Sequence, residues 1–100
     1  MSREIDSILK ERGSRYGEFK HHAELSQIIQ NTFRIAQGWE KLTHDQKEAL
    51  TMIAHKIARI LNGDPNYEDS WRDIVGYSKL VADRLLEDEL KGKVEYKNGC

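Results

Sequence analysis

Two amphipathic stretches joined by a tight turn, within residues 50–86, constrain the fold of this chain more than any other feature. In the first stretch, apolar residues recur every three or four positions, which gathers side chains on one face of an α-helix. These residues are Leu50, Ile53, Ala54, Ile57, Ile60 and Leu61. The second stretch has a broader apolar face, made of Trp71, Ile74, Val75, Tyr77, Ser78, Val81, Ala82, Leu85 and Leu86. A face of that breadth predicts burial on more than one side.

Sequence signals at the helix ends support this interpretation. Thr43 followed by Gln46 forms a capping box, which is typical of the start of a helix. Asn62-Gly63 is a helix stop, and proline suits a first helical position, so the next helix is expected to begin near Asp64-Pro65 or Asn66. Because the turn is short, we expect the two helices to be antiparallel neighbours.

The amino-terminal half predicts two further helices. Residues 2–12 form a short amphipathic segment that Gly13 would end, and residues 19–37 form a long one. Between them, Gly17 is expected to adopt a backbone conformation that other residues avoid. We therefore predict an all-α fold, a small single-domain helical bundle of one short and three longer helices, the last two an antiparallel hairpin.

The same patterns set the expected domain limits and core. Residues 1–90 are predicted to form the single helical domain, with both tryptophans, Trp39 and Trp71, in its core. After Glu89 the apolar pattern fades, so residues 91–100 are predicted to be a flexible or partner-ordered tail.

Composition narrows the class of protein. One hundred residues fit one domain, and a net charge of −1 gives no general attraction to nucleic acid or anionic lipid. No apolar run is long enough to span a membrane, and residues 1–7 lack the apolar segment of a signal peptide. Cys100 is the single cysteine, which excludes an internal disulfide framework. We expect a cytoplasmic protein without a membrane partner.

Two clusters of charged residues are candidates for chemistry. Glu68, Asp69 and Asp73 lie within about one helical turn of each other and could hold a divalent cation such as Mg²⁺. The simpler alternative, which we favour, is that Glu68 and Asp69 favour the positive end of a helix while Asp73 pairs with a base. Lys56 and Arg59 border the apolar face of the preceding helix. They could pair with Asp73, which we also favour, or donate to an anion.

No complete catalytic motif is present. The four histidines do not form a metal-ligand constellation, and there is no glycine-rich phosphate loop, nucleophile elbow or metalloprotease helix. The sequence therefore does not support an enzyme and requires no cofactor.

Three stretches carry a family resemblance. They are Arg12 with Arg15-Tyr16-Gly17-Glu18-Phe19, the run Met52 to Ile60, and the run Asp69 to Tyr77. Together they resemble a family of small uncharacterised bacteriophage and prophage proteins with the pattern RxxxYGdf, KiaRi and DsWxDiaGY. The resemblance extends from near Ile5 to Leu85. It implies a phage or prophage setting and carries no assigned activity.

The last two stretches are also distantly similar to the all-α nucleotide pyrophosphatases. That resemblance implies Mg²⁺ held by paired acidic motifs against a nucleoside triphosphate, with Glu68, Asp69 and Asp73 as one motif. The chain departs from the pattern because the partner helix offers only Glu24 or Glu48 where an ExxE pair is expected.

Our interpretation is a small phage-type binding protein that inhibits a host factor, such as a defence complex, in the host cytoplasm. Its partner would be a host protein or a protein–nucleic acid complex. The predicted contact residues are basic: Arg12, Arg15, Lys20, Lys56 and Arg59. The alternatives are a nucleoside triphosphate pyrophosphohydrolase-like protein and a homodimer joined through the apolar face of the last helix.

Overall fold

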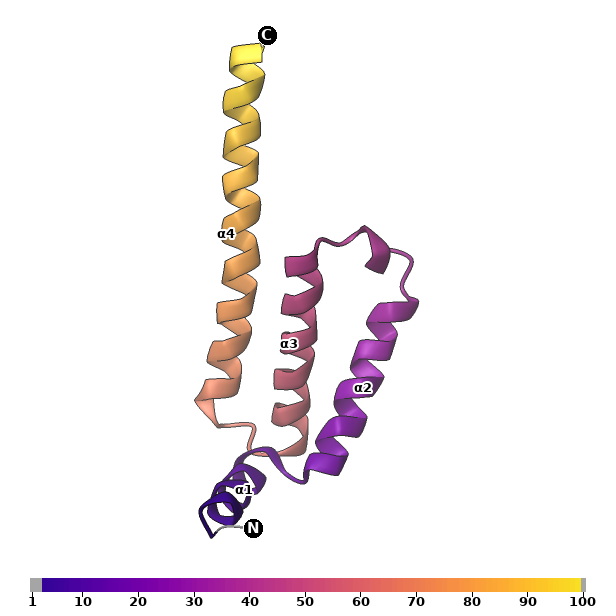
Figure 1. The fold of residues 1–100 in the computed structure, drawn as a ribbon, viewed down its shortest axis with the longest axis vertical. Helices are drawn as coiled ribbons and strands as arrows, with labels where there is room; N and C mark the ends of the chain where they lie inside the picture. The colour runs from indigo at the N-terminus through magenta and orange to yellow at the C-terminus, as the bar shows by residue number, and fades with distance from the viewer. Residues whose placement is uncertain (1–2, 100) are drawn as a thin grey trace.

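The fold is a single layer of three long helices with a fourth helix across one end (Figure 1). The computed structural model describes residues 3–99, with side chains described through residue 92. Its elements are α1 (Arg3–Tyr16), α2 (Phe19–Ile35), the 3-10 turn η1 (Trp39–Lys41), α3 (His44–Asn62) and α4 (Glu68–Gly99). α3 lies between α2 and α4 and runs antiparallel to both. The predicted all-α bundle and its terminal hairpin are confirmed, and residues 3–99 contain no strand.

The helix boundaries differ from prediction in α1. The helix continues through Gly13 to Tyr16, so the prediction that Gly13 ends it was wrong. Gly17 is the actual stop: its φ is +78°, a conformation that favours glycine, and its N–H donates to the Gly13 carbonyl at 2.9 Å. α2 also ends at Ile35, two residues before the expected end.

The turn before α4 delays the start of that helix. Asp64 Oδ1 accepts the N–H of Asn66 at 2.9 Å, an Asx turn that the side chain closes on its own backbone. α4 therefore begins at Glu68 and not at Asp64–Asn66 as predicted. At its other end, α4 extends to Gly99, so the backbone of the expected tail is helical up to that residue, while Cys100 lies outside the described residues.

α3 packs against its neighbours through small residues on opposite sides. Ala54 and Ala58 are fully buried and lie one turn apart on one side of the helix. Ala49 and Lys56 lie two turns apart on the other side, where the Lys56 ammonium meets Asp73 of α4 at 3.1 Å. Because these two positions face α4, Ala54 and Ala58 face α2. The alanines let both neighbouring helices approach α3 closely.

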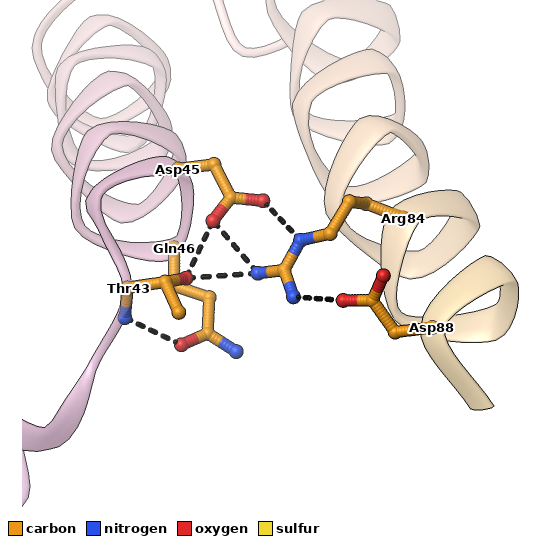
Figure 2. Close-up of polar contacts among 5 residues, drawn as sticks. All are labelled: Thr43, Asp45, Gln46, Arg84 and Asp88. Atoms are coloured by element: carbon orange, nitrogen blue, oxygen red, sulfur yellow. Dashed lines mark hydrogen bonds and ion pairs between the residues drawn. The ribbon is translucent and has the colours of Figure 1, made fainter. Parts of the chain in front are cut away.

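An arginine fastens the far end of the α3–α4 pair (Figure 2). The Arg84 guanidinium donates to both carboxylate oxygens of Asp45, at 2.9 and 2.7 Å, to Thr43 Oγ1 at 2.8 Å and to Asp88 at 2.9 Å. These hydrogen bonds hold the pKa of the Asp45 carboxyl well below its usual range. The predicted capping box is present beside them, with Gln46 accepting the Thr43 N–H at 2.9 Å. The bidentate geometry fixes the register of the two helices.

Two turns lock together at the opposite end of the layer. The Asn62 amide donates to the carbonyls of Tyr16 and Glu18, both at 2.9 Å, and the Asp64 N–H donates to the Arg15 carbonyl at 2.7 Å. This contact requires glycine on both sides. A Cβ on Gly17 would overlap the backbone of Asn62, and one on Gly63 would overlap that of Arg15 and Tyr16.

Replacing Gly63 with alanine tests this lock. We expect Gly63→Ala to lower the free energy of unfolding by about 2 kcal/mol or more, because the added Cβ meets backbone that cannot move aside. The matched control is Gly76→Ala, whose Cβ would meet open space within α4. That change should stabilise the protein by roughly 0.5–1 kcal/mol through helix propensity. Urea unfolding measures both, and equal effects would contradict the lock.

The interior of this layer holds few large apolar residues. Among the described side chains, the buried apolar residues are Ala49, Ala54 and Ala58, while Trp71 is 52% exposed. Trp71 was expected in the core; instead about half of it is exposed, and its indole N–H donates to the Pro65 carbonyl at 2.8 Å. Trp39 is half-buried and stacks on Phe33. No helix within residues 3–99 has both the length and the apolarity needed to cross a bilayer.

Candidate functional site

A cleft opens where α1 meets the start of α2 and the end of α3. Its volume is about 600 Å³. The lining residues are Leu9, Arg12, Gly13 and Tyr16 of α1, Gly17 and Glu18 of the connector, Phe19 and His22 of α2, and Arg59 of α3. The cleft thus combines three aromatic rings with two guanidinium groups and one acidic residue, Glu18. Such a combination suits a ligand that has both apolar and anionic parts.

A stack of aromatic rings and guanidinium groups starts at the cleft, which Arg59 and Tyr16 line, and continues away from it. The Arg59 guanidinium lies over the Tyr16 ring at 4.4 Å, and the Tyr16 ring meets that of Tyr67 edge-on, with centroids 6.1 Å apart. On the far side, the Arg15 guanidinium covers Tyr67 at 4.5 Å and lies 4.0 Å from Asp64. Each cation–π contact stabilises by about 0.5–2 kcal/mol. The stack therefore holds Arg59 in a defined position at the cleft.

His22 is the buried polar residue of the cleft. It is 8% exposed, and its ring stacks on that of His55 with centroids 5.9 Å apart. His22 Nδ1 is buried and has no hydrogen-bond partner among the described residues. Burial lowers the pKa of His22, and the positive charges of Arg59, His55 and Lys56 lower it further. His22 is therefore neutral at pH 7.

The five predicted contact residues fall into different environments. Arg12 and Arg59 line the cleft together. Arg15 and Lys20 are exposed, but neither lines it, and Arg15 is held by Tyr67. Lys56 is 7% exposed and paired with Asp73, so a partner cannot reach it without breaking that pair. Of the two bases expected to reach Asp73, Lys56 does and Arg59 does not.

The aromatic part of the cleft was missed in the sequence. Tyr16, Phe19 and His22 line it but were not among the predicted site residues. The available signal was the Arg12–Phe19 segment, in which Arg12, Tyr16 and Phe19 recur at helix-like spacing around Gly17. How these residues meet Arg59 depends on the direction of α1, which no local pattern specifies.

The three carboxylates considered for a metal are engaged by side chains of the protein, and Arg72 lies within ion-pair distance of both Glu68 and Asp69. Glu68 pairs with Arg72, and Asp69 accepts the Tyr67 hydroxyl at 2.9 Å, which raises the pKa of Tyr67. Asp73 is the partner of Lys56. Among the side chains described, no three histidine, cysteine or acidic residues gather into a metal-binding group. This arrangement provides helix and ion-pair contacts and no shared set of oxygen ligands.

The family comparison adds one finding. A model for a domain of unknown function, DUF6378, matches residues 2–85. The chain belongs to the DUF6378 family. The expected membership of an uncharacterised family is thereby confirmed, and the DUF6378 region includes the whole cleft and the Lys56–Asp73 pair. No match was found among curated proteins or among solved structures.

Removing the partner of Lys56 tests the buried ion pair. We expect Asp73→Ala to lower the free energy of unfolding by about 1–3 kcal/mol, because it leaves a buried ammonium unpaired. Asp83→Ala, on the same helix, removes only the exposed pair with Lys79 and should change stability by less than about 0.5 kcal/mol. Both variants gain the same helix propensity, so the difference reports the pair. Equal stabilities in urea unfolding would contradict it.

The depressed pKa of His22 predicts acid sensitivity. The unfolded chain binds a proton at His22 near its ordinary pKa of 6.5, whereas the folded chain binds it only at lower pH. Stability should therefore be complete above pH 6.5 and fall as the pH drops below it. Thermal melts between pH 7.5 and 5 should show a shallower fall for His22→Gln than for the wild type. The exposed neighbour provides the control: His21→Gln should retain the wild-type fall.

Proposed function

We propose that this chain acts by binding another protein at the cleft between α1, α2 and α3. The observation that carries the proposal is the pairing of Arg12 and Arg59 with the rings of Tyr16 and Phe19 in one open cleft. Guanidinium groups bind carboxylates with two parallel hydrogen bonds, and aromatic rings beside them accept apolar side chains. A protein segment with an acidic residue next to an apolar one has the matching chemistry.

The resemblance to phage and prophage proteins suggests where such a partner would be found. We propose a host protein as the target, with the chain inhibiting a host factor such as a defence complex in the host cytoplasm. Arg12 and Arg59 are the contact residues that geometry favours among the predicted set. Lys20 is exposed near the start of α2 and would contact the partner at the rim of the interface.

The nucleotide-handling alternative has less support. It needs carboxylates that share one Mg²⁺ ion, whereas Glu68 and Asp69 are engaged by Arg72 and Tyr67, and Asp73 by Lys56. Lys56, which would contact phosphate in that alternative, is buried against Asp73.

Charge reversal in the cleft tests the proposal. The tagged full-length chain would be used to capture proteins from a bacterial host lysate, with retained proteins identified by mass spectrometry. For a protein that the wild type retains specifically, Arg12→Glu should weaken binding at least roughly tenfold, because it places a carboxylate against the partner's own. The Arg12 side chain is exposed, so the melting temperature should not change.

The control for this experiment is Arg34→Glu, an equal charge change at the far end of α2, where the exposed Arg34 contacts Asn31. It should retain the partner as the wild type does. If Arg12→Glu retains the partner equally well, or if both reversals weaken binding alike, the cleft is not the contact site.

A further inference from the structure

On α3, and on α4 as far as Leu85, one face of the helical layer carries no charged side chain; the next position of the same spacing on α4 is Glu89. We define the apolar face by ten positions that follow the heptad-like steps of four and three residues. They are Gln46, Leu50, Ile53, Ile57 and Ile60 on α3, and Trp71, Val75, Ser78, Ala82 and Leu85 on α4. One third of the residues in this chain are charged (33%), but none of these ten positions is. That difference distinguishes the face from the rest of the surface.

The two rows lie on the same side of the layer and meet in a shallow hollow. The hollow has a volume of about 290 Å³ and is lined by Leu42, Gln46, Ala49, Leu50, Ile53, Ser78 and Val81. It therefore joins members of the α3 row to Ser78 of the α4 row. On the opposite side of α3 lies a different row, Met52, His55 and Arg59, which ends at the cleft.

The whole chain exposes more surface than a compact monomer of its mass. A compact protein of 11.6 kDa exposes about 5,800 Å² by the usual scaling with mass. This chain exposes 7858 Å². The difference exceeds the roughly 800 Å² that each partner contributes to a standard protein interface. Part of the excess surface belongs to α4 where that helix extends past α3 (Figure 1).

Little large apolar surface is buried within one copy of the chain. The buried apolar side chains among the described residues are three alanines, whereas Trp71, Val75 and Leu85 are all exposed by 44% or more. Large apolar side chains stabilise by about 1.5–3 kcal/mol each when they are fully buried, and alanines by much less. A second layer against the apolar face would provide the core that one layer lacks.

We propose that two copies of this chain associate through their apolar faces. The α3–α4 pair of one copy packs on the α3–α4 pair of the other, and the four helices form a bundle whose core is made of the two rows. In a two-fold interface each residue near the axis meets its own copy, so a charge there would be repelled by itself. The absence of charge from all ten positions satisfies that condition.

The shape of the apolar face also favours a second copy of the chain as its partner. Small residues at Ser78 and Ala82 lie between the large side chains of Val75 and Leu85, next to the hollow. Ridges of large side chains from one copy can enter the hollow of the other, so the face is complementary to itself. A second copy is also present wherever the chain folds, unlike any other partner.

The direct test is the mass of the wild-type full-length chain in solution by light scattering and sedimentation equilibrium. We expect twice 11.6 kDa at micromolar concentration. We also expect a melting temperature that rises with protein concentration, because folding is then linked to association. A mass of 11.6 kDa together with a melting temperature constant over a hundredfold range of concentration would overturn the proposal.

A pair of variants tests whether the apolar face is the dimer interface. Ala82→Arg places a charge within it, at an exposed position of a helix, and should convert the dimer to a monomer or to a chain that melts at lower temperature. Leu80→Arg is the matched control, because Leu80 is 69% exposed on the opposite side of α4. It should leave the dimer intact. A dimer that Ala82→Arg leaves unchanged, or that Leu80→Arg disrupts equally, would overturn the assignment of this face.

Disulfide cross-linking tests the same contact between the two apolar faces without introducing a charge. With Cys100 replaced by serine, Ser78→Cys should form a covalent dimer on mild oxidation, and Leu80→Cys should not. If Leu80→Cys cross-links as well as Ser78→Cys does, the two copies do not meet at the apolar face. Neither this test nor the mass measurement depends on the binding partner proposed for the cleft.

Discussion

The close approach of α2 and α4 to the two sides of α3 is the contact on which the rest of the structure depends. Ala54 and Ala58 on one side, and Ala49 on the other, permit that approach because they add little beyond the backbone. With such small side chains at the contacts, polar groups fill much of the space between the helices. On the α2 side Ser26 Oγ lies 3.5 Å from His55 Nδ1 of α3, and on the α4 side Lys56 meets Asp73. These polar contacts specify register, while apolar burial within one layer remains small.

The two ends of the layer are fixed by different means. At one end, Arg84 joins α4 to the start of α3 through charged hydrogen bonds to Asp45. At the other end, Asn62 and two glycines join the α1–α2 connector to the α3–α4 turn through backbone contacts. Because the second contact also places α1, the cleft depends on it directly. The glycines of this contact therefore serve the site as well as the fold.

Local patterns in the sequence predicted the helices and their pairing but not the contacts made at a distance. The spacing of Leu50, Ile53 and Ile57 specifies a helix by itself, and the short turn requires an antiparallel neighbour. That was sufficient to anticipate the Lys56–Asp73 pair. Gly13 and Gly17 are equally good helix stops in a local view. What selects Gly17 is the backbone of Asn62, which lies 45 positions later in the chain.

The parts of the site that escaped prediction share this cause. Arg59 was expected to pair with Asp73 or to donate to an anion, but its guanidinium lies over the Tyr16 ring, which the direction of α1 places there. The exposure of Trp71 has a different origin. Apolar neighbours at helical spacing predict that the face of α4 with Trp71 is buried. In a single layer of helices no other helix covers that face. The breadth of the apolar pattern predicted burial on more than one side, whereas within one chain Trp71, Val75 and Leu85 remain exposed.

The row of Met52, His55 and Arg59 lies on the side of α3 opposite the apolar face, and this separation affects how the protein would hold a target. In a two-fold pair joined through the apolar faces, both clefts remain outside the interface. A target that carries two copies of its docking segment would then be bound twice. The second attachment takes place at the high local concentration set by the first, so the pair would dissociate far more slowly than a single cleft does.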